Sequence, residues 1–280
     1  MAKGSVTSRL VSAEPRVRRG YFECRFGQLH VHNAIPPGGG FDEATPIICL
    51  HGSPASGREF QRLLMLLGRD RSVYAPDLPG YGASDPPPAR PQIADYAAAI
   101  GDFCDTMRFR QIDLFGHHSG ALVALELALA KPTTIKRVVL MSVPVATEAE
   151  REAFRRAPWP AAPVQDGSHL ITEWRRTLES ARAGTPLEVS ARRFADQLCG
   201  GANASWGVHA ALQYPARDRL GLASHPTLIL RPKDPEWEST QRARELIPRA
   251  RMIDLPELGG DALESDGEPI AAALREFLHG

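Results

Sequence analysis

The segment Gly116-His117-His118-Ser119-Gly120 constrains this chain more than any other feature of its sequence. It lies between two largely apolar runs, which is the order of a buried strand, a tight turn and a helix. In a turn this sharp, the residues two before and two after the apex must be small. Only one register meets that condition, with Gly116 and Gly120 on either side of His118. We therefore predict a histidine at the apex of a strand–turn–helix unit.

Short apolar runs alternate with amphipathic patterns along much of the chain, which predicts parallel strands joined by helices. The alternation stops near residue 144 and resumes near residue 218, and the intervening segment has helical patterns without a convincing strand. We predict an α/β core at 21–144 and 218–280, a helical cap at 145–217 and a flexible arm at 1–20.

Composition excludes several classes of function. The 33 basic and 33 acidic residues balance, so nothing indicates a nucleic-acid partner or an anionic membrane surface. No apolar run approaches the roughly 20 residues of a membrane span, and the amino-terminal 20 residues lack the apolar centre of a signal peptide. No glycine-rich phosphate pattern or metal-ligand spacing occurs. We expect a cytoplasmic protein that acts on a small molecule without a cofactor or metal. The sequence leaves open whether the protein forms a homodimer.

Three segments together carry a family resemblance: His-Gly-Ser-Pro at 51–54, Asp-Leu-Pro-Gly-Tyr-Gly-Ala-Ser-Asp at 77–85, and the turn at 116–120. In this order they resemble the α/β-hydrolase fold, and especially capped members such as haloalkane dehalogenases, epoxide hydrolases and small esterases. The resemblance implies a mostly parallel eight-stranded sheet flanked by helices, with a helical cap inserted after the sixth strand.

The resemblance also implies where the catalytic groups of the family would fall. The apex nucleophile position is His118, and the acid after a late strand is Asp234. The family histidine after the last strand is missing, because Gly260 stands there. An oxyanion hole would be formed by the backbone N–H groups of Ser53 and Ser119. The Ser119 hydroxyl itself is expected to point along the start of the helix.

A chain that lacks both nucleophile and histidine cannot use the usual acyl-enzyme route. We therefore expect His118 to act as a general base, because the ordinary pKa of histidine, near 6.5, suits proton transfer at neutral pH. The expected activity is hydrolysis of a small, largely apolar, carbonyl-containing molecule. His169, Trp174 and His209 in the cap are the expected pocket residues. Two alternatives stay open, a non-hydrolytic lyase or isomerase at the same site and a catalytically silent ligand-binding protein.

Overall fold

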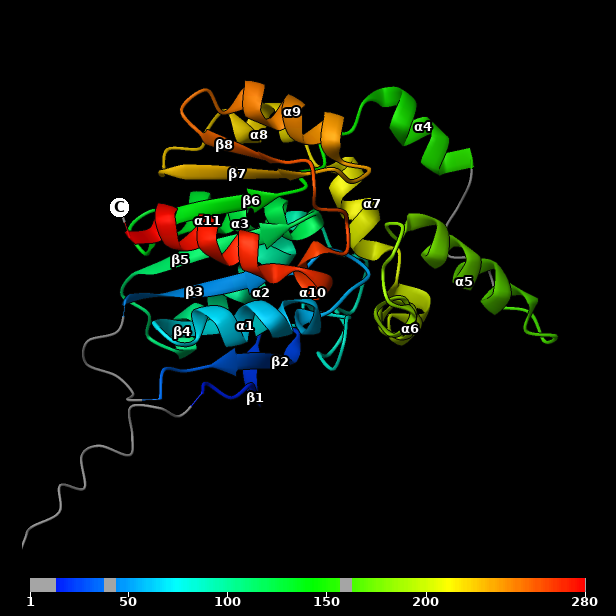
Figure 1. Cartoon of the computed structure of the whole chain (residues 1–280), viewed down its shortest axis with the longest axis horizontal. Coiled ribbons are helices and arrows are strands. Elements are labelled where there is room, and N and C mark those ends of the chain that lie inside the picture. Colours follow the sequence, from blue (N-terminus) through cyan, green and yellow to red (C-terminus); the bar gives the residue numbers. More distant parts are fainter. Residues whose placement is uncertain (1–13, 38–43, 157–162, 280) are drawn as a thin grey trace, which may run out of the picture.

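A computed structural model describes residues 14–37, 44–156 and 163–279. Within these residues a single sheet of eight strands has the order β1-β2-β4-β3-β5-β6-β7-β8, with helices on both sides (Figure 1). The strands are β1 (Arg18–Cys24), β2 (Gly27–Ala34), β3 (Ala44–Leu50), β4 (Arg71–Pro76), β5 (Ile112–His117), β6 (Ile135–Met141), β7 (Thr227–Pro232) and β8 (Arg251–Leu255).

Among the described strands, the β1–β2 and β2–β4 pairs are antiparallel, and the remaining pairs, from β4 to β8, are parallel. The central strands are apolar on both faces, because helices cover both. In β3, for example, Ile47 to Leu50 are fully buried. The carboxyl ends of the parallel strands meet at one edge of the sheet, where ligands of open α/β sheets bind. The predicted mostly parallel eight-stranded sheet is confirmed.

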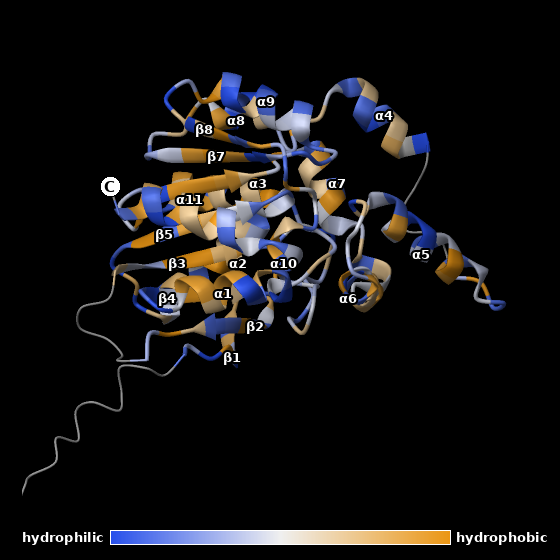
Figure 2. Cartoon of the chain, viewed as in Figure 1, coloured by the Kyte–Doolittle hydropathy of each residue, from blue (hydrophilic) through white to orange (hydrophobic). Residues whose placement is uncertain are grey.

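Two apolar clusters fill the spaces between the sheet and its helices. One contains residues of α2 (Ile93–Thr106) and α3 (Ser119–Ala130), and the other contains residues of α1 (Gln61–Leu67) and α11 (Gly267–His279). The strands between them are the most hydrophobic part of the molecule (Figure 2). Two short helical turns, η2 (Gly57–Phe60) and α10 (Ala262–Ser265), precede α1 and α11 respectively.

A helical insertion, which we define as the helices between β6 and β7, interrupts the core where the sequence predicts a cap. Its members are α4 (Glu148–Arg156), α5 (Ser168–Ser180), α6 (Leu187–Cys199), η3 (Gly201–Asn203), α7 (Trp206–Gln213) and α8 (Ala216–Leu220). Figure 1 shows α4 to α7 beyond the ends of the strands, while α8 lies back against the core. Helix α9 (Trp237–Leu246) then joins β7 to β8.

The predicted amino-terminal arm, 1–20, differs from the structure at its end. Residues 1–13 lie outside the described residues, but Arg18, Arg19 and Gly20 are the first residues of β1 and pair with β2. The start of this strand cannot be recognised from the sequence, because these three residues lack the apolar side chains whose alternation indicates a strand. An edge strand needs no apolar side chains on its exposed face. Among the described helices, none has the length and apolarity that a membrane crossing requires.

Candidate active site

His118 occupies the turn between β5 and α3 and lies at its apex. Its backbone has φ 51° and ψ −124°, a conformation that costs a residue other than glycine about 1–3 kcal/mol. A Cβ atom at Gly116 would overlap the backbone oxygen of Gly120, and one at Gly120 would overlap that of Leu50. The turn therefore requires both glycines, and it presents the His118 imidazole to a cavity.

A glutamate that the sequence analysis does not identify holds this imidazole. The Nε2 atom of His118 lies 3.4 Å from Oε1 of Glu236, the residue directly before α9. Burial alone would lower the pKa of His118, but the hydrogen bond and charge of Glu236 outweigh burial and raise it. Burial likewise favours a raised pKa for Glu236, and its contact with His118 lowers that pKa instead. The pair therefore favours an imidazolium beside a carboxylate.

The second ring nitrogen of His118 is differently placed. Its Nδ1 atom is buried and makes no hydrogen bond with the described residues. Because Glu236 occupies Nε2, Nδ1 is the ring nitrogen that remains open to a further partner. A buried nitrogen without a partner costs free energy, and such groups occur at sites that receive a ligand or water.

Asp234 lines the same cavity, but it does not contact either imidazole of the turn. Its Oδ2 accepts a hydrogen bond from Ser142 Oγ at 2.5 Å, and its Oδ1 accepts one from the backbone N–H of Glu236 at 2.9 Å. Burial raises its pKa, although these hydrogen bonds oppose the shift. The loop after β7 thus carries two carboxylates, and the second one reaches His118. Sequence spacing alone cannot distinguish them.

The serines of the predicted oxyanion hole contact each other. The backbone N–H of Ser53 donates to Ser119 Oγ at 2.8 Å, and that hydroxyl donates to Ser53 Oγ at 3.2 Å. The expectation that the Ser119 side chain points along the helix start is therefore wrong. A buried N–H needs an acceptor, and the neighbouring hydroxyl supplies one. An oxyanion could use the Ser53 N–H only after Ser119 Oγ moves away.

Gly260 lies in the cavity wall, and the resemblance places the family histidine at this position. A Cβ atom added there would meet only the Asp234 Cβ, at 3.6 Å, which is an ordinary contact. The backbone at Gly260 therefore has room for the Cβ atom of a side chain beside Asp234.

The structure does not bring the predicted cap residues to this cavity. His169 accepts a hydrogen bond from the backbone N–H of Val164, and Trp174 packs edge-on against Phe194 within the insertion. His209 packs against the ring of Phe154. These three predicted residues are absent from the cavity lining. Aromatic and histidine side chains in an amphipathic helix also serve packing between helices, and the sequence does not separate the two uses.

The cavity lies between the core and the insertion and has a volume of about 350 Å³, near the lower end of the range for small-molecule sites. Its core side includes His117, His118 and the carboxylates described above. The insertion contributes polar and charged residues, namely Arg176, Thr177, Ser180, Arg193, Asp196 and Gln197. Pro54, Ala55, Pro235 and Leu263 also line the cavity, so its surface is both charged and apolar. The expectation of a largely apolar substrate stays a prediction.

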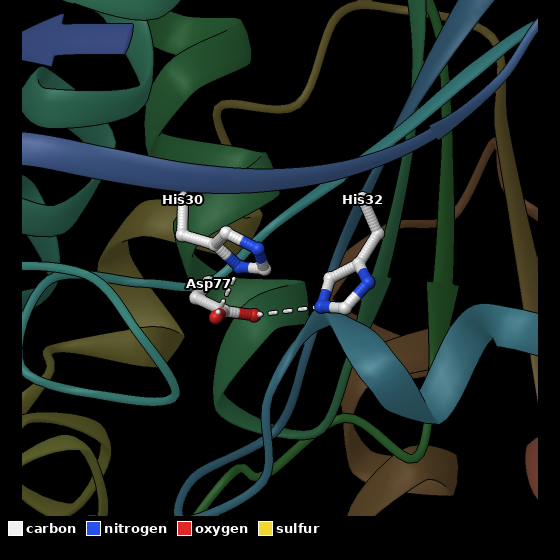
Figure 3. Close-up of side chains that lie close together, drawn as sticks. All are labelled: His30, His32 and Asp77. Carbon is white, nitrogen blue, oxygen red and sulfur yellow. Dashed lines mark hydrogen bonds and ion pairs between the residues drawn. The ribbon is translucent and has the colours of Figure 1, made fainter. Parts of the chain in front are cut away.

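His30, His32 and Asp77 form a second polar cluster, which the sequence analysis misses (Figure 3). His30 Nδ1 lies 2.8 Å and His32 Nε2 3.6 Å from the Asp77 carboxylate, which also accepts the backbone N–H groups of Gly57 and Ala83. In a tetrahedral zinc site two ligand atoms lie about 3.3 Å apart. The distance of 2.8 Å between His30 Nδ1 and Asp77 is shorter and fits a hydrogen bond. Burial lowers the pKa of His32 to about 4. We interpret the cluster as a structural link between β2 and the end of β4.

Comparison with known proteins identifies the family. The family model for the alpha/beta hydrolase fold matches residues 45–230. The chain belongs to the α/β-hydrolase family. A curated relative from Pseudomonas savastanoi pv. phaseolicola, named "Putative carbamate hydrolase RutD", is 27% identical over 251 residues, which are 85% of this chain and 95% of the relative.

Solved structures of α/β hydrolases agree with this fold. A hydrolase from Pseudomonas aeruginosa PA01 has a TM-score of 0.75 at 20% identity, covering 94% of this chain and 99% of that one. The enol-lactonase from Burkholderia xenovorans LB400 has a TM-score of 0.71 at 14% identity, covering 93% and 100%. The likeness to haloalkane dehalogenases and other capped members within the family stays a prediction.

Proposed function

We propose that this α/β hydrolase hydrolyses a small carbonyl-containing molecule, with His118 as the general base in place of a serine nucleophile. The observation that carries the proposal is the contact of 3.4 Å between His118 Nε2 and Glu236 Oε1. A carboxylate that holds an imidazole stabilises the imidazolium formed when the ring accepts a proton. The curated relative is named "Putative carbamate hydrolase RutD", and a carbamate contains a carbonyl group, which supports this substrate class.

In the proposed reaction, neutral His118 takes a proton from water while the water oxygen attacks the carbonyl carbon. The ring nitrogen without a partner, Nδ1, is the proton acceptor, and the ring must rotate to bring this buried atom to the water. The tetrahedral intermediate then expels the leaving group, which receives the proton back from His118. The Ser53 N–H stabilises the oxyanion once the Ser119 hydroxyl has turned away. No covalent intermediate and no cofactor is required.

One observation favours the ligand-binding alternative. The Ser119 hydroxyl already occupies the Ser53 N–H, so the anion site is closed before substrate arrives. If that hydroxyl does not turn away, the cavity binds a ligand without turning it over. The lyase or isomerase alternative gains no specific support.

The test is a panel of esters, lactones, carbamates and epoxides, assayed with the wild type and His118→Ala. We expect turnover of at least one carbonyl compound, and a loss of about 10²–10⁴-fold in kcat/KM in the variant, the usual contribution of a general base. His225→Asn is the control, because His225 contacts the Pro132 carbonyl away from the cavity. Turnover that survives His118→Ala removes His118 from the mechanism. A ligand-induced rise in Tm without any turnover supports the binding protein instead.

A further inference from the structure

Besides His118 Nδ1, a second polar atom without a partner lies at the cavity wall formed by the insertion and α10. Arg193 of α6 and Glu264 of α10 face each other there, with Arg193 Nε 3.5 Å from Glu264 Oε2. The Nη1 atom of Arg193 is buried and makes no hydrogen bond with the described residues. A guanidinium carries five N–H donors in a planar fork, and those on Nη1 of Arg193 have no acceptor among the described residues.

Two other carboxylates near this wall already have partners. Glu59 accepts hydrogen bonds from the Gly52 N–H and from His117 Nδ1, both at 3.2 Å. Asp196 accepts from Ser56 Oγ at 3.2 Å and from Arg58 Nη1 at 3.0 Å. Apart from Glu264, the unused hydrogen-bonding capacity of this wall is therefore that of the Arg193 donors. A ligand group with paired acceptor atoms fits it better than a cation does.

We propose that Arg193 binds a carboxylate group of the substrate, with Glu264 as the neighbour that orients its guanidinium. Arg–carboxylate pairs are commonly bidentate, which fixes the direction of the ligand as well as binding it. The inference rests on the proposed function, because the other end of the same molecule would lie at His118. In a cavity of about 350 Å³, such a substrate is a small acid with a second, hydrolysable carbonyl group.

Glu264 need not repel this carboxylate near neutral pH. Its burial raises its pKa to about 8, Glu59 and Asp196 add to the rise, and Arg193 and Arg192 oppose it. The protonated carboxyl group can donate a hydrogen bond to the ligand. Above about pH 8 the group ionises and repels the ligand carboxylate, so we expect affinity for a carboxylate to fall there.

The experiment is calorimetric titration with butyrate, with butyramide and butylammonium as neutral and cationic probes of the same length. The wild type should bind butyrate at least tenfold more tightly than butyramide, and Arg193→Gln should lose that preference. Arg175→Gln is the matched control, because it makes the same charge change at an exposed site of the insertion outside the cavity lining. Tm measurements confirm that each variant is folded. In Glu264→Gln, the fall in butyrate affinity between pH 7 and 9 should be reduced.

Several outcomes would overturn the carboxylate subsite. These are equal binding of butyrate and butyramide, preference for butylammonium, tighter binding of inorganic phosphate than of butyrate, no butyrate binding, and unchanged butyrate binding in Arg193→Gln. Titration of His118→Ala separates the two proposals. If this variant keeps both turnover and butyrate binding, the role of His118 fails and the subsite stands. If turnover needs His118 but Arg193→Gln binds like the wild type, only the subsite fails.

Discussion

At the scale of single residues, the unusual feature of this hydrolase is an imidazole on a strained turn. A strained φ/ψ pair persists only where surrounding structure enforces it, and here Gly116 and Gly120 allow the close approach that does so. The position of His118 could be predicted from the sequence, because the small residues leave one register. Its partner Glu236 could not, because the choice between two carboxylates in one loop depends on side-chain direction.

Ser119→Ala distinguishes a general base from a hidden serine nucleophile. We expect kcat/KM not to fall by more than about tenfold, because the Ser119 hydroxyl takes no part in the proton transfer and its removal frees the Ser53 N–H. Stability should fall by about 1–3 kcal/mol, since the buried Ser53 N–H loses its acceptor. Steady-state kinetics and urea unfolding measure the two effects. A loss of more than 100-fold in kcat/KM would mean that the serine itself attacks the substrate.

At the scale of elements, strand and helix order follow from the sequence pattern, whereas contacts between distant elements do not. The apolar runs predict the parallel strands because both faces of these strands are covered. The predicted pocket residues of the insertion, His169, Trp174 and His209, are absent from the cavity lining. An amphipathic pattern shows that a helix has a buried face, but it does not show what covers that face.

The link between β2 and the end of β4 predicts an acid-sensitive contribution to stability. Burial lowers the pKa of His32 to about 4 from an ordinary value of 6.5. Between these two pH values His32 is therefore mostly protonated in the unfolded chain and mostly neutral in the folded chain. Stability from this group is complete above pH 6.5 and falls as the pH drops toward 4, by up to about 3 kcal/mol.

His32→Gln tests this contribution by urea unfolding at pH 7.5 and pH 5. The variant should lose less stability between the two pH values than the wild type does. His225→Asn serves as the control histidine and should keep the wild-type difference. An unchanged difference in His32→Gln would show that other groups cause the acid sensitivity.

The molecule as a whole has the fold of an α/β hydrolase, and the proposed function places its departure from the family at two positions, His118 and Gly260. Asp234 and Gly260 both line the cavity, and a Cβ atom at Gly260 would meet only the Asp234 Cβ, at 3.6 Å. The scaffold should therefore accept the usual serine machinery.

We predict that the double variant His118→Ser, Gly260→His reacts with a fluorophosphonate probe and that the wild type does not. The introduced histidine would lie beside Asp234 and activate the introduced serine. Intact-protein mass spectrometry detects the adduct, and each single variant is a control that lacks one partner. Labelling of the wild type at Ser119 would contradict the assignment of the turn apex.

The pH dependence of kcat/KM in the wild type and in Glu236→Gln tests the role of His118 most directly. A general base must be neutral, so wild-type kcat/KM should rise with pH through an apparent pKa above the ordinary 6.5, because Glu236 raises the pKa of His118. In Glu236→Gln burial remains while the opposing charge is lost, so the rise should move to lower pH. The same rise in both proteins, or its persistence in His118→Ala, would contradict the assignment of His118 as the base.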